Sequence, residues 1–317
     1  MPRVKGSTQS YLKVQYEFRP AKQVERRMLV DALHMLSHAG FRICDYQYTG
    51  LGSIAFVDFI LFHKLLGIAK MLSVEHDRAI RRRIEFNKPF DFIEVEIGEI
   101  GNVIPSLSDD EKHVLWLDYD DIVSEDHLED IKLAATYLTR GSLLIVTIDI
   151  EPPGGEDDGP AEWREYFEDQ AGVYLPQDLN DSDFLEHRLT RVNIDIVGRA
   201  IKAGIKGRGL RMIPLFNFVY ADGHRMLTMG GMIGTDVDRR RIAGSGVKDL
   251  FYARLDWRSE PYEIRVPVLT LKERSFLDSK MPCRQGYRPK KFELPPEYVE
   301  AYKEIYRFMP IYAELLL

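Results

Sequence analysis

Apolar and polar positions along the first two thirds of the chain alternate between two periods. Apolar residues recur at helical spacing in four long segments, and short continuous apolar runs between them predict buried strands. The predicted helices are 24–38, 55–66, 125–138 and 183–203, with a short basic helix at 77–85. The predicted strands are 41–49, 70–74, 90–95, 113–117 and 142–148. This alternation of helices and strands predicts an α/β fold with a parallel sheet.

A different pattern follows the last of these helices. Two apolar runs, 210–220 and 225–233, are separated by Asp222-Gly-His224, which predicts an antiparallel hairpin with a type I′ turn. The expected fold is therefore a Rossmann-like sheet, mostly parallel, that ends in an antiparallel β-hairpin. We assign residues 1–235 to this domain. Residues 236–317 are predicted to be a C-terminal extension packed on it, as a cap, a substrate lid or a dimerisation element.

Composition narrows the class of protein. The chain has 317 residues, of which 45% are hydrophobic, so it can form a large core and is neither disordered nor of low complexity. No apolar run approaches the roughly 18–20 residues that span a bilayer, so no membrane partner is expected. Its two cysteines, Cys44 and Cys283, cannot form a disulfide scaffold or a four-thiolate zinc site. We expect a cytoplasmic protein, with Cys44 buried in the first strand.

Charge is unevenly distributed along the chain. Residues 149–186 contain 13 acidic residues and one basic residue, whereas residues 187–291 contain 22 basic and 10 acidic residues. The acidic stretch begins with a proline- and glycine-rich run, 151–160, which predicts an exposed loop or the base of an insertion at 150–182. The two blocks could simply face each other or water. Alternatively, the basic block 188–291 could bind nucleic acid, although the formal charge of −7 opposes that role.

A glycine-rich turn follows the first predicted strand and carries the first candidate chemistry. In Tyr48-Thr-Gly50-Leu-Gly52-Ser53, glycines would let backbone N–H groups approach a ligand. Glu75 follows Gly52 by 23 residues and stands at the end of the next strand. An acidic residue in that position can accept hydrogen bonds from ribose hydroxyls.

These elements and motifs resemble the class I S-adenosylmethionine-dependent methyltransferase fold over residues 24–234. The runs Arg19–Met28 and Tyr48–Ser53 are similar to a group of bacterial proteins labelled O-methyltransferases, and the similarity extends through Phe56-Val-Asp-Phe59, His63-Lys64 and Ser73-Val-Glu75. The resemblance implies S-adenosylmethionine as cofactor and an oxygen acceptor of unknown identity. It places Tyr48, Gly50, Gly52 and Ser53 beneath the methionine and ribose portions, Glu75 on the ribose, and His76 beside the adenine.

The same resemblance places catalysis at the carboxyl end of the fourth strand, where Asp118-Tyr119-Asp120-Asp121 stands. Asp118 or Asp120 could orient the acceptor or remove a proton, and Tyr119 could stack on a planar substrate. A divalent cation is a weaker alternative, because Ile150 replaces the amide that would complete such a site after Asp149. We therefore predict no metal site. Asp118 could also be a helix cap without a catalytic role.

Two departures from the superfamily pattern keep other functions open. Tyr48 occupies the position of the usual acidic residue, and Ile54 that of the third glycine. The chain could thus be a degenerate Rossmann-like binding or signalling module. The basic block 188–291 leaves open a methyltransferase that modifies nucleic acid. A basic cluster in the first helix could hold an anionic ligand or pair with the acidic insertion; it comprises Arg19, Lys22, Arg26 and Arg27.

Overall fold

A single sheet organises the computed structural model, which describes residues 19–52, 54–155 and 157–310. The order of its eight strands is β3-β2-β1-β4-β5-β7-β6-β8. Their bounds are β1 (Gln47–Leu51), β2 (Lys70–Glu75), β3 (Ile93–Ile97), β4 (His113–Ile122), β5 (Leu143–Asp149), β6 (Arg211–Ala221), β7 (Arg225–Gly234) and β8 (Tyr262–Ile264).

The first five strands are parallel, and β7 is antiparallel both to β5 and to β6. The predicted fold class, a mostly parallel sheet that ends in an antiparallel hairpin, is therefore confirmed. Strand β8 adds to β6 in parallel, beyond the predicted domain boundary at residue 235.

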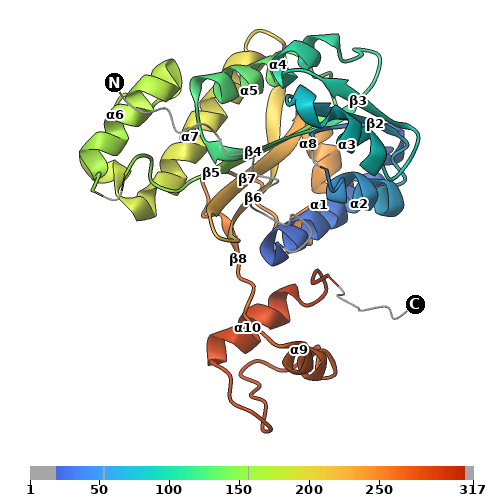
Figure 1. Cartoon of the computed structure of the whole chain (residues 1–317), viewed down its shortest axis with the longest axis vertical. Helices are drawn as coiled ribbons and strands as arrows, with labels where there is room; N and C mark the ends of the chain where they lie inside the picture. Colours follow the sequence, from blue (N-terminus) through green and yellow to red (C-terminus); the bar gives the residue numbers. More distant parts are fainter. Residues whose placement is uncertain (1–18, 53, 156, 311–317) are drawn as a thin grey trace.

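Helices cover both faces of the sheet (Figure 1). One face carries α1 (Pro20–His38), α2 (Val57–Leu66), α3 (Arg81–Asn87) and α8 (Asp236–Ala243). The other carries α4 (Ile100–Val103), α5 (Glu125–Tyr137), α6 (Pro160–Ala171) and α7 (Glu186–Ile205). Each face has its own apolar core, so the sheet separates a core beneath α1 and α2 from one beneath α5 and α7. No helix among the described residues is both long and apolar enough to cross a membrane.

Beyond β8, the C-terminal extension projects from the sheet as α9 (Leu271–Asp278) and α10 (Pro296–Ile305), at the bottom of Figure 1. The end of α10 returns to the core under α1, where Ile305 and Phe308 pack. Whether the extension serves as cap, lid or dimerisation element stays a prediction.

Three local predictions are wrong. Strand β1 begins at Gln47, because residues 43–45 form a short 3₁₀ helix, and Cys44 is exposed rather than buried in a strand. The hairpin loop has three residues with positive φ only at Gly223, whereas a type I′ turn needs two such residues. Strand β4 continues to Ile122, so the run from Asp118 to Asp121 lies within the strand instead of after it.

The acidic stretch is only partly the exposed loop that its composition predicts. After the loop, α6 begins at Pro160, a residue suited to the first turn of a helix because it lacks a backbone N–H. The Glu162 side chain accepts a hydrogen bond from the N–H of Gly159, which closes the helix start. Phe167 and Ala171 anchor the helix on the α7 face of the sheet.

Candidate functional site

The carboxyl ends of the parallel strands meet at one edge of the sheet, where open α/β folds bind their ligands. Strands β1 and β2 pair in parallel, and β1 also pairs with β4. This arrangement brings the turn after β1, the end of β2 and the polar part of β4 to the same edge. Most of the residues that the sequence singles out therefore lie in one region, although not all of their side chains face it.

The turn after β1 requires glycines because neighbouring side chains lie very close to its backbone. A Cβ atom at Gly52 would lie 2.8 Å from both Cβ and Oε2 of Glu75, and one at Gly50 would lie 2.5 Å from the Tyr48 hydroxyl. Neither glycine has a positive φ, so space is the constraint. The N–H of Gly52 donates to the carbonyl of Val74, which ties the turn to β2. Ser53 lies outside the described residues.

Glu75 is held against this turn. Its side chain is 7% exposed, and Oε1 accepts a hydrogen bond of 2.9 Å from the backbone N–H of Asp77. Burial raises the pKa of the carboxyl group, and the N–H of Asp77 opposes this rise. Oε2 lies 2.8 Å from the position that a Cβ atom would take at Gly52. His76 is 73% exposed, with Nδ1 3.4 Å from Glu75 Oε1.

Tyr48 lies in the core beneath Gly50. Its ring makes edge contacts with Phe59 and Phe62, and its hydroxyl donates a short hydrogen bond to Asp58 in the first turn of α2. Burial and the Asp58 carboxylate both raise the pKa of Tyr48, so the phenol keeps its proton and remains a donor. Any effect of Tyr48 on a ligand would therefore pass through Gly50 and Asp58.

The extension of β4 separates two of the predicted catalytic residues. Successive side chains of a strand point to opposite faces, so Asp118 faces α1 whereas Tyr119 faces α5. The hydroxyl of Tyr119 donates to Asp130 at 3.1 Å, and its ring stacks on His127 with 4.0 Å between centroids. The structure thus does not bring Tyr119 together with Asp118.

Asp118 is bound to a buried lysine of α1. The Lys22 ammonium lies 2.6 Å from Asp118 Oδ1, 3.0 Å from the Tyr220 hydroxyl and 3.0 Å from a Glu25 oxygen. Lys22 is 1% exposed, but Asp118 keeps 28% of its side chain accessible at the edge. Burial would raise the pKa of Asp118, but Lys22 outweighs it and lowers the pKa below its ordinary value. Asp118 therefore stays ionised near neutral pH.

A relay of hydrogen bonds fixes Glu25 from the sheet side. Trp116 Nε1 donates to the Thr147 hydroxyl at 2.9 Å, and that hydroxyl lies 2.8 Å from the hydroxyl of Thr228. Thr228 in turn donates a short hydrogen bond to Glu25. Three strands of the sheet are thereby tied to the charged face of α1.

The start of α1 is fixed in the same way. The carboxylate of Asp222, in the hairpin loop, accepts the N–H groups of Ala21 and Lys22 at 3.1 and 2.8 Å. Arg19 lies 3.6 Å from Asp120. Two members of the predicted basic cluster, Arg19 and Lys22, thus pair with the edge of the sheet, and the alternative that Lys22 pairs with the acidic insertion is wrong.

Sequence reasoning did not identify Glu25, Asp58, Tyr220 and Asp222 as parts of this site. Glu25 stands inside the run Arg19–Met28 and Asp58 inside Phe56–Phe59, both of which carry the family resemblance, and this was the available signal. Tyr220 and Asp222 belong to the hairpin, whose place beside α1 only the sheet order reveals.

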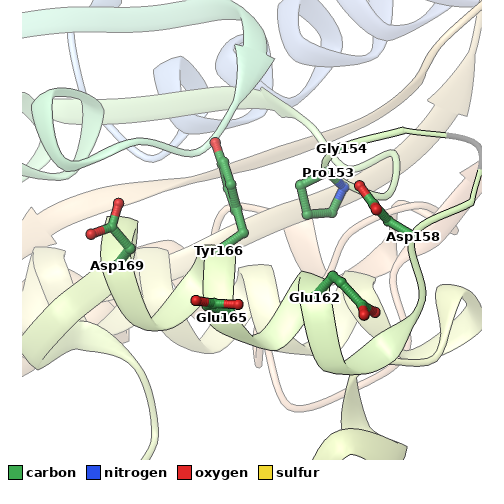
Figure 2. A pocket seen from close by; sticks show the side chains of 7 residues that line it. All are labelled: Pro153, Gly154, Asp158, Glu162, Glu165, Tyr166 and Asp169. Atoms are coloured by element: carbon green, nitrogen blue, oxygen red, sulfur yellow. The ribbon is translucent and has the colours of Figure 1, made fainter. Parts of the chain in front are cut away.

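An acidic pocket lies beside the same edge, between the loop after β5 and α6 (Figure 2). It has a volume of about 390 Å³ and is lined by Pro153, Gly154, Asp158, Glu162, Glu165, Tyr166 and Asp169. The Tyr166 hydroxyl donates to the carbonyl of Val123, directly after β4. Asp149 accepts from the N–H of Glu151 and lies 3.0 Å from exposed His224. Within 19–52, 54–155 and 157–310, no group of three or more acidic, histidine or cysteine side chains could hold a metal ion.

A larger, basic groove of about 1010 Å³ lies at the opposite edge of the sheet, beside the end of α7 and the start of β6. Some basic residues of the block 188–291 form ion pairs with nearby acidic residues. For example, Arg211 lies 2.8 Å from Asp236. Cationic side chains on α7 and just beyond it line the groove together with Trp257, namely Arg199, Lys202 and Lys206.

A sequence profile of the family described as "Putative O-methyltransferase" matches residues 14–317. No curated protein sequence matches the chain. Similar solved structures include Trm1 from Pyrococcus horikoshii in complex with S-adenosyl-L-methionine, which is 13% identical over 70% of this chain and 57% of that chain, with a TM-score of 0.44. A putative O-methyltransferase from Klebsiella pneumoniae is 14% identical over 67% of this chain and 88% of that chain, with a TM-score of 0.36.

Proposed function

The chain belongs to the putative O-methyltransferase family, and from this premise we propose that it transfers a methyl group from S-adenosylmethionine to an oxygen acceptor. The observation that carries the proposal is the contact between Gly52 and Glu75. A glycine turn that leaves no room for a Cβ, with a buried carboxylate over it, suits a ribose-bearing ligand at this edge.

The residues present fit the cofactor. Gly50 and Gly52 would expose the backbone of the turn to it, and Glu75 Oε2 would accept hydrogen bonds from the ribose hydroxyls. His76, exposed beside Glu75, could cover the base. When bound, S-adenosylmethionine supplies a methyl group activated by its sulfonium.

Asp118 fits the role of orienting the acceptor. An ionised carboxylate held by Lys22 is a good hydrogen-bond acceptor but a weak base, because its pKa lies below the ordinary value. Asp118 would therefore align an acceptor hydroxyl and stabilise positive charge at the edge, and Asp120 beside it would contribute a second acceptor. Such positioning is a substantial source of rate enhancement.

Titration calorimetry with S-adenosylmethionine tests the proposal directly. We expect binding by the wild type and weaker binding, by about 1.5–3 kcal/mol, for Glu75→Gln, which loses a charge-assisted interaction. Because burial raises the pKa of Glu75, this variant should unfold no more readily than the wild type at pH 7. Absence of wild-type binding would contradict the proposal. Binding without transfer to any acceptor in a screen with labelled methyl groups would favour the degenerate module.

A nucleic-acid acceptor is the second candidate function, favoured by the basic groove with Arg199, Lys202 and Lys206. Filter binding of RNA and DNA at several salt concentrations tests it, since phosphate contacts give a steep salt dependence. Lys202→Glu combined with Lys206→Glu should abolish such binding. If it persists unchanged, the groove is not the contact.

We also propose that the protein works in the cytoplasm. Both cysteines are free thiols, and Cys44 is exposed, which suits a reducing compartment. A fractionation experiment with the tagged full chain would test the location.

A further inference from the structure

One cation of α1 is buried without the hydrogen bonds that such a group requires. Arg26 is 4% exposed, and its Nε and Nη1 atoms are buried with no hydrogen-bond partner among the residues that the structure describes. Lys22, one turn earlier, has three partners. A guanidinium normally binds a carboxylate or phosphate through two parallel hydrogen bonds, so leaving it unpaired is costly.

The carboxylates near Arg26 are engaged by other donors. Asp58 accepts from Tyr48, and Asp118 accepts from Lys22. Arg26 lies one helical turn after Lys22, whose ammonium contacts Asp118. Burial raises the pKa of Asp58 and Arg26 opposes this rise, whereas Arg26 adds to the lowering of the Asp118 pKa by Lys22. The guanidinium is thus surrounded by negative charge but makes no hydrogen bond with it.

Asp58 and Tyr48 lie close to the glycine turn. The Tyr48 hydroxyl, which binds Asp58, lies 2.5 Å from the place a Cβ would take at Gly50. Arg26 also affects the pKa of Tyr48 and so belongs to the same group of side chains. A ligand that rests on the turn would therefore extend toward Arg26, Asp58 and Asp118.

The methionine portion of S-adenosylmethionine carries one carboxylate, one ammonium and one sulfonium. Its charges complement the three side chains, since an unpaired guanidinium seeks a carboxylate and the two acids favour cationic centres. We propose that Arg26 binds the carboxylate of the cofactor's methionine portion, while Asp58 and Asp118 face its positive centres. This inference rests on the proposed function and adds the residue that anchors the far end of the cofactor.

The simplest alternative makes Arg26 only a counter-charge for Asp58 and Asp118. In that case Arg26 stabilises the fold, and its mutation changes the affinity for any ligand indirectly, whether or not the ligand carries a carboxylate. The two roles differ in whether the effect of Arg26 depends on the ligand's carboxylate.

Decarboxylated S-adenosylmethionine, which lacks this one group, separates the roles by titration calorimetry on the full chain. We expect the wild type to bind S-adenosylmethionine about 10- to 100-fold more tightly than the decarboxylated compound. Arg26→Met should lose this preference and bind the two ligands with similar, weak affinity. Lys132→Met, which removes a partly exposed cation of α5, should keep the wild-type preference.

Each other outcome has a distinct meaning. A wild type that binds neither ligand refutes the proposed function itself. A wild type that binds both equally, or an Arg26→Met variant that keeps the preference, overturns the role of Arg26 and leaves the proposed function intact. If Arg26→Met does not fold, as shown by its thermal unfolding, Arg26→Lys replaces it and should reduce the preference; an unreduced preference overturns the proposal.

Discussion

The ammonium of Lys22 lies 2.6 Å from the carboxylate of Asp118, although 96 positions separate the two residues in the chain. This pair joins the first helix to the carboxyl end of β4 and leaves Asp118 ionised but partly exposed. The acid that sequence reasoning assigns to catalysis is therefore also part of the packing between α1 and the sheet. Mutations of Lys22 or Asp118 should change stability and ligand binding together.

Lys22→Met should destabilise the protein strongly. It would leave Glu25 and Asp118 without their buried cation, and breaking a buried ion pair typically costs about 3–5 kcal/mol. Lys132→Met is a suitable control, because Lys132 forms an exposed pair with Glu129 at 2.9 Å and such pairs contribute less than about 1 kcal/mol. Urea unfolding measures both variants. Equal losses in the two would show that the buried cluster has no special role.

Asp118→Asn should lower the free energy of unfolding by about 1.5–3 kcal/mol at pH 7, since Lys22 then loses a charged partner. The folded-state pKa of Asp118 is depressed, so its contribution is fully present above the unfolded-state value and is lost as pH falls through the folded one. The difference from wild type should hold between pH 8 and 5 and shrink below about pH 4. Denaturant unfolding at several pH values checks this. A difference that already shrinks between pH 7 and 5 would refute the depressed pKa.

Gly52→Ala should weaken both stability and cofactor binding. The added Cβ would lie 2.8 Å from Glu75 and 3.0 Å from the carbonyl of Val74, so the turn must shift away from β2. Gly98→Ala, just after β3, provides the control, because a Cβ there meets nothing within 4 Å. Thermal unfolding and calorimetry of the two variants test the contrast. A Gly52→Ala variant with wild-type affinity would remove the turn from the binding site.

Asp130→Asn should stabilise the protein at pH 8. Burial raises the pKa of Asp130 to about 6, while the hydrogen bond from Tyr119 opposes this rise. A carboxyl group with a raised folded-state pKa destabilises the fold when it is ionised. The extra stability of Asp130→Asn over the wild type should therefore diminish as pH falls from 7 toward 4. Calorimetric unfolding temperatures across this range measure it, and cofactor affinity should not change. A gain that grows at low pH would contradict the raised pKa.

The succession of helices and strands along the chain was predictable because apolar runs and helical spacing reflect burial. The first half of α1 was less predictable. The sequence pattern placed the start of this helix at residue 24, whereas α1 begins at Pro20. The reason is that its buried face carries Lys22, Glu25 and Arg26, which a pattern of apolar positions cannot detect. Charges inside a protein are satisfied by partners distant in sequence, and no local pattern encodes those partners.

The end of β4 was mispredicted for a related reason. Aspartate is rare in strands, so Asp118 and Asp120 marked the end of the predicted strand. Their partners, Lys22 and Arg19, come from α1 and compensate for this preference. The length of β4 determines which of its side chains share a face of the sheet. Because the predicted strand ended before Asp118, the orientation of Tyr119 was open, and the sequence alone could not exclude Tyr119 from the site.

The carboxylate of Asp222 holds the backbone of α1 across 200 residues of chain. At roughly 5–20 residues per second of synthesis, the first helix leaves the ribosome about 10–40 seconds before this anchor exists. In that interval Lys22 and Glu25 lack Tyr220 and Thr228, both of which belong to the hairpin. A nascent chain can thus pair its parallel strands early, but its first helix docks only after the hairpin is made. The ability to bind a ligand at this edge should arise late in synthesis and be absent from chains that stop before residue 222.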